Sequence, residues 1–420
     1  MINPLQYVPK GDKHNSDFFN EYRIKIFERR IACGLSELIG DIAAVIIQVQ
    51  TGDAIGYLKE LYLMTPYRYA ASFITKTHKI YCLVNKKMAP VLFVLEPLEY
   101  NFIDNITRIN KRYPNAREKF NARYVGELFS TKNIQETKEI LINQNFRFLS
   151  PEDSPNPFYF NPHFEFTQWS DLTLNTIGYT DIDPMDFDRL KFGQPFTLTK
   201  EEQADLDRID QFGIENGIKP LIKGIDHLAT RILANEREDA ILEFLCLSNY
   251  YFWGAYNISE MNSSTNVNRV LHGNDITSPA KVFTANNTPF MINSFENLPM
   301  PTEEFVRNYG RRMHHIAMEV VDGDHASGVK NIDYVVHTLK DKGHVEFLAR
   351  IFGACNNEPD LKQIFSKHSK RSLLITEYLE RCHGFDGFFT KENVAALTEA
   401  AGLDETLKST ERVTPGIIGD

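Results

Sequence analysis

The chain has 42% hydrophobic and 24% charged residues, which is an ordinary globular composition. Its length of 420 residues is too great for one hydrophobic core, so we expect two domains. Its net charge of −10 argues against binding to nucleic acid or to an anionic membrane surface. Residues 1–16 lack the apolar core of a signal peptide and no apolar stretch is long enough to span a bilayer, so we predict a cytoplasmic protein that does not bind membranes.

The first part of the chain alternates helical and strand-like patterns. Apolar residues at helical spacing predict a helix over residues 16–39. Runs rich in Val, Ile, Leu and aromatic residues then predict strands. These strands are expected at residues 43–50, 79–84 and 91–95.

A second unit begins with an apolar strand at residues 123–128 and continues with a helix that opens at residues 130–133 and ends near residue 142. Aromatic, strand-like pieces such as residues 164–169 follow. After them, Thr199 and Glu202 have the capping-box spacing, which predicts the start of an acidic helix. We interpret this helix as a connector between domains.

Two further units follow, and each opens with an apolar strand that carries a histidine, His227 in the first and His315 in the second. Repetition at this scale predicts four modules of the β-α-β-β-β type that are paired into two domains. The strands that open the first two units carry no matching histidine, so only the second pair is expected to hold chemistry.

His227, His315 and Glu377 are the candidate metal ligands. Each interrupts an apolar strand, where an unpaired carboxylate in particular would be costly. Two imidazoles and one carboxylate leave positions open for substrate and oxygen, as in non-haem Fe(II) oxygenases. Other histidines lie among charged residues and are expected at the surface. These are His325, His337, His344 and His368.

The five cysteines are odd in number, scattered and never in a C-x-x-C pair. This usage is typical of reduced thiols, so we expect packing residues rather than disulfides or a zinc site. They are Cys33, Cys82, Cys246, Cys355 and Cys382.

From about residue 223 to 397 the sequence resembles 4-hydroxyphenylpyruvate dioxygenase and its relatives in the vicinal-oxygen-chelate superfamily; before residue 223 the resemblance is only topological. The segments that carry it are Ile225-Asp226-His227, His315-Ile316-Ala317, residues 361–367, residues 375–381 and residues 389–397.

The resemblance implies an α+β fold of two vicinal-oxygen-chelate domains, each made of two βαβββ modules, with an open barrel around Fe(II) in the C-terminal domain. Residues 1–190 would form an N-terminal domain without a metal site. Residues 191–222 would form the helical connector, residues 223–400 the catalytic domain and residues 401–420 a tail.

Carried over by position, the family pattern implies that Gln363 lines the site beside the metal and that Phe365 forms one wall. Phe389 and Asn393 would lie on a C-terminal helix that caps the pocket. Plain core packing is the alternative for the two phenylalanines, whereas an amide in a buried strand needs a partner.

The sequence departs from the family where substrate would bind. The family's Gln before the second histidine is His314 here, and its second aromatic residue on the closing helix is Val394. Its Asn-Ser strand is best matched at Asn268, and Glu296 stands near its Pro-x-Asn pattern. These changes predict a substrate other than 4-hydroxyphenylpyruvate. The alternative for His314 is a surface position or a contact that supports a metal ligand.

The resemblance thus implies an Fe(II) enzyme that takes a small 2-oxo acid and O2, decarboxylates the acid oxidatively and hydroxylates the same molecule. The alternatives are 4-hydroxyphenylpyruvate dioxygenase or hydroxymandelate synthase proper, an extradiol ring-cleaving dioxygenase, and a non-catalytic binding protein on the same scaffold. The Gln363 strand and the closing helix argue against ring cleavage, and the complete ligand set argues against a non-catalytic protein. The oligomeric state stays open, with a homo-oligomer as one alternative.

Overall fold

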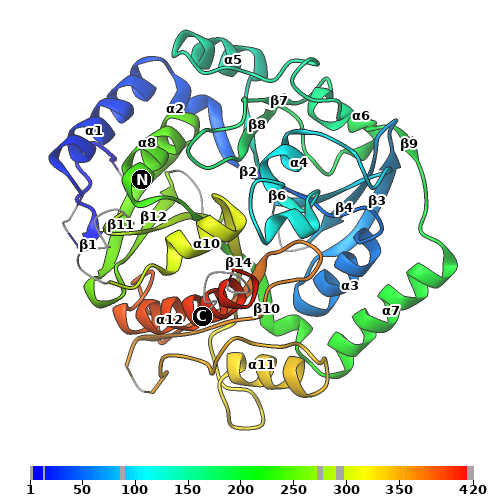
Figure 1. Cartoon of the computed structure of the whole chain (residues 1–420), viewed down its shortest axis with the longest axis vertical. Coiled ribbons are helices and arrows are strands. Elements are labelled where there is room, and N and C mark those ends of the chain that lie inside the picture. Colours follow the sequence, from blue (N-terminus) through cyan, green and yellow to red (C-terminus); the bar gives the residue numbers. More distant parts are fainter. Residues whose placement is uncertain are drawn as a thin grey trace, which may run out of the picture.

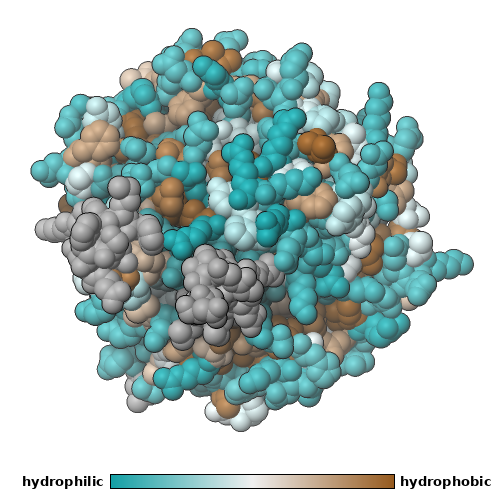
Figure 2. Space-filling model, viewed as in Figure 1, coloured by the Kyte–Doolittle hydropathy of each residue, from teal (hydrophilic) through white to brown (hydrophobic). Residues whose placement is uncertain are grey.

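The computed structural model describes residues 3–12, 15–85, 90–271, 278–289, 298–356 and 358–413, with side chains up to residue 402. Two mixed sheets of eight strands each lie side by side, with helices around their outside (Figure 1). In the face that Figure 2 shows, apolar residues form small groups between hydrophilic ones. Among the described residues, no helix is long and apolar enough to cross a membrane.

The N-terminal sheet has the strand order β7-β8-β6-β2-β5-β4-β3-β9. Its strands are β2 (Ile39–Gln48), β3 (Arg68–Ile74), β4 (His78–Val84), β5 (Val91–Pro97), β6 (Arg123–Thr131), β7 (Glu165–Phe166), β8 (Thr176–Thr180) and β9 (Gln194–Pro195). The C-terminal sheet has the order β1-β11-β12-β13-β10-β14-β16-β15. Its strands are β1 (Lys10–Gly11), β10 (Ile222–Arg231), β11 (Tyr250–Ile258), β12 (Ser263–Val270), β13 (Ala280–Asn286), β14 (Arg312–Val320), β15 (Asp360–Phe365) and β16 (Ile375–Cys382).

The α-helices cover the sheets and connect their strands (Figure 1). They are α1 (Asp17–Ala32), α2 (Leu35–Leu38), α3 (Ala54–Met64), α4 (Asn105–Asn110), α5 (Ile134–Asn143), α6 (Phe187–Leu190), α7 (Lys200–Glu215), α8 (Arg237–Leu247), α10 (Pro301–Tyr309), α11 (Asn331–Asp341) and α12 (Lys391–Val413). Short 3-10 helices are η1 (Ala116–Lys119), η2 (Pro157–Phe160), η3 (Lys219–Leu221), η4 (Ala234–Glu236) and η5 (Ser259–Met261).

The two sheets repeat one pairing pattern, which confirms the α+β fold built from paired modules. At the centre of each sheet two strands run antiparallel, β2 with β6 and β10 with β14. Each of these strands also has a parallel neighbour, namely β5, β8, β13 and β16 in chain order. In the second and fourth modules, one strand of the βαβββ unit is reduced to isolated bridges such as Phe148 with Thr167 and Phe347 with Ser366.

The central strand pairs also share their irregularities. Val125 of β6 has no pairing partner in β2, although the residues on either side of it pair with two consecutive residues of β2. In the same way, His314 of β14 has no pairing partner in β10, although the residues on either side of it pair with two consecutive residues of β10. Such a β-bulge leaves one extra residue in a strand and redirects the side chains around it. The bulge therefore belongs to the repeated backbone and is not peculiar to the half that contains the histidines.

The start of the chain lies with the C-terminal sheet, although the sequence analysis assigned it to the N-terminal domain. Strand β1 pairs parallel with β11, and α1 packs against α8. The buried Arg30 of α1 donates hydrogen bonds to the carbonyl oxygens of Leu245 and Tyr250, at 3.1 and 2.7 Å. The N-terminal sheet itself begins only at Ile39.

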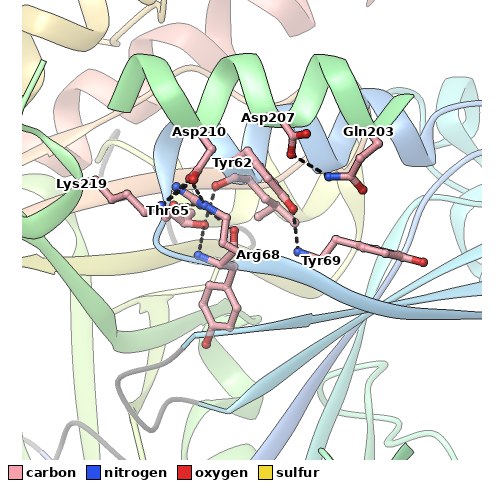
Figure 3. Close-up of polar contacts among 10 residues, drawn as sticks. Tyr62, Thr65, Arg68, Tyr69, Gln203, Asp207, Asp210 and Lys219 are labelled. Carbon is pink, nitrogen blue, oxygen red and sulfur yellow. Dashed lines mark hydrogen bonds and ion pairs between the residues drawn. The ribbon is translucent and has the colours of Figure 1, made fainter. Parts of the chain in front are cut away.

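The connecting helix α7 begins with the predicted capping box, because the Thr199 hydroxyl and the Glu202 carboxylate each accept a hydrogen bond from the other residue's backbone N–H. Helix α7 packs on α3. Figure 3 shows Asp210 of α7 between Arg68 of β3 and Lys219, whose Nζ lies 2.6 and 2.7 Å from the two carboxylate oxygens. The pair of Arg68 with Asp210 attaches the connector to the N-terminal sheet, and the pair of Lys219 with Asp210 lies within the connector.

The prediction that no cysteine is disulfide-bonded is wrong for Cys355 and Cys382, which form a disulfide with their Cα atoms 5.7 Å apart. The reason is the register of the β15–β16 hairpin, which places Asp360 opposite Cys382. The segment just before Asp360, which contains Cys355, therefore lies beside Cys382. Cysteine spacing does not reveal that register. Cys33, Cys82 and Cys246 are free thiols, as expected.

Candidate metal centre

The three predicted ligands come together from three neighbouring strands. His227 of β10 lies opposite Ala317 of β14, and Ala317 lies opposite Glu377 of β16. The small alanine leaves space between the two larger side chains, and His315 projects into this space from two positions earlier on β14, on the same face of the strand. All three ligand side chains are buried.

The donor atoms are spaced as one metal ion requires. The His227 Nε2 atom lies 3.2 Å from His315 Nε2 and 3.1 Å from Glu377 Oε2, and the distance from His315 Nε2 to that oxygen is 3.2 Å. Ligand atoms that are each about 2.1 Å from one ion lie roughly 3.0 to 3.4 Å apart at angles between a right angle and the tetrahedral angle. Two imidazoles and one carboxylate therefore fit a single divalent ion.

The orientation of His227 is set by a carboxylate and an arginine behind it. His227 Nδ1 donates a hydrogen bond to Asp226 Oδ1 at 2.7 Å, and Arg381 Nη2 donates to the same oxygen at 3.2 Å. This fixes the tautomer that leaves the Nε2 lone pair for a metal. Burial raises the pKa of Asp226, but Arg381 and His227 outweigh it and hold that pKa well below its usual range. Burial likewise lowers the pKa of His227, but the carboxylates of Glu377 and Asp226 outweigh it and raise that pKa to about 9.

His315 is supported by its sequence neighbour. Because of the β-bulge, His314 and His315 both line the pocket, and their Nδ1 atoms lie 2.8 Å apart in a hydrogen bond. Burial, His227 and Arg231 lower the pKa of His315 well below its usual value, so its imidazole is neutral. His314 is therefore a buried residue that contacts a ligand, not a surface residue. His368, expected at the surface, is half-buried, with its ring 5.7 Å from that of His314.

Gln363 of β15 orients the third candidate ligand, Glu377. Its Nε2 donates to Glu377 Oε1 at 2.7 Å, which leaves Oε2 for the centre. The amide's Oε1 is buried, and no described atom forms a hydrogen bond with it. Buried amide oxygens are normally hydrogen-bonded, so a bound molecule is the expected partner.

The pocket beside these ligands has aromatic walls. The ring of Phe365 lies 4.8 Å from that of His315, and the ring of Phe389 lies 5.2 Å from that of His227. Helix α12, which packs on β11, β12 and β15, contributes Val394 and Leu397 to the same lining. The remaining described lining residues are Arg231, Ser263, Thr265, Val282, Thr284, Thr302 and Thr398.

Two predicted pocket residues are absent from the described lining. Asn268 lies on the other face of β12 from Thr265, because side chains alternate along a strand, and its amide donates to the Lys281 carbonyl at 3.2 Å. Asn393 instead attaches α12 to β15 through a 2.6 Å hydrogen bond to the Leu361 carbonyl. Glu296 lies outside the described residues.

Arg231, which was not predicted as a site residue, lines the pocket from β10. It stands four residues after His227, and an even spacing along a strand puts both side chains on one face. The same alternation places Thr265 and Thr284 on the pocket face of their strands. Strand alternation counted from His227 would have placed this arginine on the same face as the ligand, without distinguishing a pocket position from a surface one.

Comparison with protein-family models and with curated protein sequences finds no match. Among solved structures, the chain is similar to a mutant of 4-hydroxymandelate synthase from Streptomyces coelicolor, with 14% identity and a TM-score of 0.58 over 87% of this chain and 99% of that chain. It is also similar to a xylose isomerase-like TIM barrel/4-hydroxyphenylpyruvate dioxygenase fusion protein, with 10% identity and a TM-score of 0.53 over 94% of this chain and 60% of the other. The chain therefore has the two-domain vicinal-oxygen-chelate fold that its sequence resemblance implied.

Proposed function

We propose that the protein is an Fe(II)-dependent dioxygenase that oxidatively decarboxylates a 2-oxo acid and hydroxylates the remainder of the same molecule. The observation that carries the proposal is the buried cluster of His227, His315 and Glu377, with donor atoms 3.1 to 3.2 Å apart beside a lined pocket. A two-histidine, one-carboxylate set is typical of non-haem Fe(II) oxygenases. The fold that the chain shares with 4-hydroxymandelate synthase supports the same reaction class.

In this proposal each residue has a defined task. His227, His315 and Glu377 would hold the ion, and bound Fe(II) would supply the reaction of O2 with the 2-oxo acid. Asp226 and Gln363 orient two of the ligands by hydrogen bonds at 2.7 Å. Aromatic walls keep water away from the reacting groups, which strengthens electrostatic contacts with substrate.

The substrate we propose is not 4-hydroxyphenylpyruvate. His314 and Val394 line the pocket at the positions where the sequence departs from the family pattern. The replacement of an aromatic residue by Val394 removes a stacking surface for a substrate ring. The lining also includes Arg231 and several hydroxyl side chains, which suit a polar substrate end.

The test is a reaction screen with metal-reconstituted protein. Protein loaded with Fe(II) without air is mixed with O2 and a panel of aromatic and aliphatic 2-oxo acids and catechols, while O2 uptake and CO2 release are measured. We expect at least one 2-oxo acid to give equal amounts of O2 consumed and CO2 released. The activity is expected to disappear in His227→Ala and to persist in His337→Ala, which changes an exposed histidine of α11. O2 uptake only with catechols and without CO2 would contradict the proposal in favour of ring cleavage.

A further inference from the structure

The end of the pocket remote from the carboxylate ligand is built from one polar row that crosses three strands. Arg231 of β10 pairs with Thr284 of β13, and Thr284 pairs with Thr265 of β12. All three residues line the pocket. Because cross-strand partners on one face of a sheet are close neighbours, the guanidinium and the two hydroxyl groups form a single polar patch.

On β10, β13 and β12 an apolar row lies between this patch and the position of His227. Ala229 pairs with Val282, and Val282 pairs with Val267, one step along the same face of the sheet. His227 stands one further step away. The Cα atoms of His227 and Arg231 are thus about 13 Å apart along the strand. His315 of β14 pairs with Ala229, so this candidate ligand stands at the β14 end of the same apolar row. Along β10, β13 and β12 the pocket therefore runs from the position of His227 through apolar side chains to a cationic patch.

The environment of Arg231 holds its charge inside the pocket. The residue is only 5% exposed, and its guanidinium carbon lies 4.8 Å from the ring centroid of Phe305. Its Nη1 donates to the Pro301 carbonyl at 3.4 Å. An arginine positioned in this way, with several N–H donors in a fixed plane, is well suited to bind a carboxylate.

Thr284 gives an independent sign of a ligand. Its Oγ1 atom is buried, and no described atom forms a hydrogen bond with it. Buried hydroxyl groups are normally hydrogen-bonded, because an unsatisfied one loses its contacts with water without replacing them. A carboxylate bound at Arg231 would accept the hydrogen bond that this hydroxyl can donate.

The polar row is not a requirement of the fold. The N-terminal sheet repeats the same register, and the row there consists of Gln48, Leu95 and Ile80. Leu95 and Ile80 belong to its apolar core. The fold therefore accepts an uncharged row at this register and does not itself require a charged one.

We infer that Arg231, Thr284 and Thr265 bind a carboxylate at the end of the substrate remote from the metal, so that the enzyme acts on 2-oxo acids that carry a second, terminal carboxylate. This inference rests on the proposed function for the metal-binding end of the substrate. The 2-oxo acid group lies at the ligands, the carbon chain crosses the apolar row, and the terminal carboxylate meets Arg231.

The experiment compares pairs of 2-oxo acids of equal length that end either in a carboxylate or in a methyl group, such as 2-oxoadipate and 2-oxohexanoate, over a series of chain lengths. Two quantities are measured on Fe(II)-loaded protein: kcat/KM from O2 uptake, and Kd without O2 from calorimetry. For the wild-type protein we expect both quantities to favour the carboxylate-ended member by roughly 10- to 100-fold at the best chain length, as is typical of a hydrogen-bonded charged group.

Arg231→Gln should lower kcat/KM and raise Kd for the carboxylate-ended acids by the same factor and leave the values for the methyl-ended acids nearly unchanged. Thr284→Val is close to isosteric and should produce a smaller change in the same direction, so the test survives if the arginine variant does not fold. Arg208→Gln, at a side chain that is 77% exposed, is the matched control and should leave the preference unchanged.

A wild-type preference for methyl-ended acids, or an unchanged preference in folded Arg231→Gln and Thr284→Val, would overturn the inference while turnover itself upheld the proposed function. If no 2-oxo acid is turned over, but carboxylate-ended acids bind and Arg231→Gln abolishes their binding, the carboxylate site stands and the proposed reaction fails. Absence of both turnover and carboxylate-dependent binding would reject both.

Discussion

The two sheets of this protein have the same strand pairing but carry different inward-facing side chains. The positions of the three candidate metal ligands in the C-terminal sheet have counterparts at the same register in the N-terminal sheet. In the order of the ligands, these counterparts are Ala44, Gly126 and Gly178. None of them offers a ligand atom from its side chain. The repeated backbone therefore does not by itself make a metal site.

Aromatic side chains fill the corresponding space in the N-terminal sheet. Phe166 pairs with Gly178, and a Cβ atom added to that glycine would lie 2.4 Å from the Phe166 ring. The ring of Phe158 lies 6.1, 5.6 and 5.2 Å from those of Phe166, Phe164 and Phe192. The counterparts of Phe166 and Phe164 in the C-terminal sheet are Phe365 and Gln363, which line the pocket. One scaffold therefore supports a packed core or a reactive pocket, depending on a few inward-facing side chains.

The largest expected effect comes from replacing a candidate ligand of the C-terminal sheet by the residue at the matching position of the N-terminal sheet. His227→Ala, with the alanine found at position 44, should remove stoichiometric Fe(II) binding. It should also lower O2 uptake on the order of a thousandfold, which exceeds the roughly 10- to 100-fold effect typical of a ligand's supporting partner. Metal analysis and O2 uptake measure this change. Thermal unfolding checks that the variant is folded, as the alanine in the N-terminal sheet leads us to expect. Full activity with stoichiometric metal would show that His227 is not a ligand.

A substitution in the N-terminal sheet should lower the stability of the protein and leave its activity unchanged. Phe158→Ala leaves a cavity in the N-terminal aromatic core and should lower the free energy of unfolding by about 3–5 kcal/mol. Urea denaturation measures the loss. Iron stoichiometry and kcat should be unchanged at temperatures where the variant is folded. If activity falls in proportion to the loss of stability in this half, the division between a structural and a catalytic sheet fails.

A third change weakens the support of one ligand without removing it. Asp226→Asn keeps the shape of the side chain but removes the carboxylate that accepts the hydrogen bond of His227 Nδ1. Fe(II) affinity should fall roughly 10- to 100-fold. Competition with a chelator measures the affinity, and Asp341→Asn at an exposed position is the control. Equal affinities of the Asp226→Asn variant and the wild type would mean that Asp226 does not orient the ligand.

The smallest effect concerns His78, a buried histidine in the N-terminal sheet at the counterpart of Ser263. Burial lowers the pKa of His78 to about 3, so the folded protein keeps this imidazole neutral while the unfolded chain takes up a proton below pH 6.5. The contribution of the neutral His78 to the free energy of unfolding is therefore complete above pH 6.5 and is lost as the pH falls toward 3. At pH 5 the loss is about 2 kcal/mol.

Urea denaturation of the wild type and of His78→Ser between pH 7 and pH 5 measures this term. The wild type should lose about 2 kcal/mol more stability than the variant over that interval. Parallel losses in the two proteins would mean that His78 is protonated in the folded state or that its charge is accommodated there.

The sequence was sufficient to predict the modules and the candidate ligands, because histidine and glutamate side chains interrupt strands that are otherwise apolar. A buried polar group needs a partner, and the two histidines occupy matching positions in repeated units. Gln363 was predicted from the family resemblance, and a buried amide needs a partner, which the structure gives as Glu377.

Features that depend on strand register were not predictable in this way. The β-bulge that turns His314 into the pocket and the hairpin that joins Cys355 to Cys382 both follow from pairings between distant segments. Asn268 was placed in the pocket by sequence matching, but a shift of one residue along a strand moves a side chain to the opposite face. Arg231 lay on the correct face, but no local pattern distinguishes a pocket arginine from a surface one.

We expect His227, His315 and Glu377 to hold one iron ion. Anomalous diffraction at the iron edge, from crystals grown without air in the presence of Fe(II), tests it most directly. We predict a single strong peak at about 2.0–2.2 Å from His227 Nε2, His315 Nε2 and Glu377 Oε2, and no peak at these residues in His227→Ala. A peak bound by other side chains, or no peak in the wild-type protein under conditions where Fe(II) supports O2 uptake, would contradict the claim.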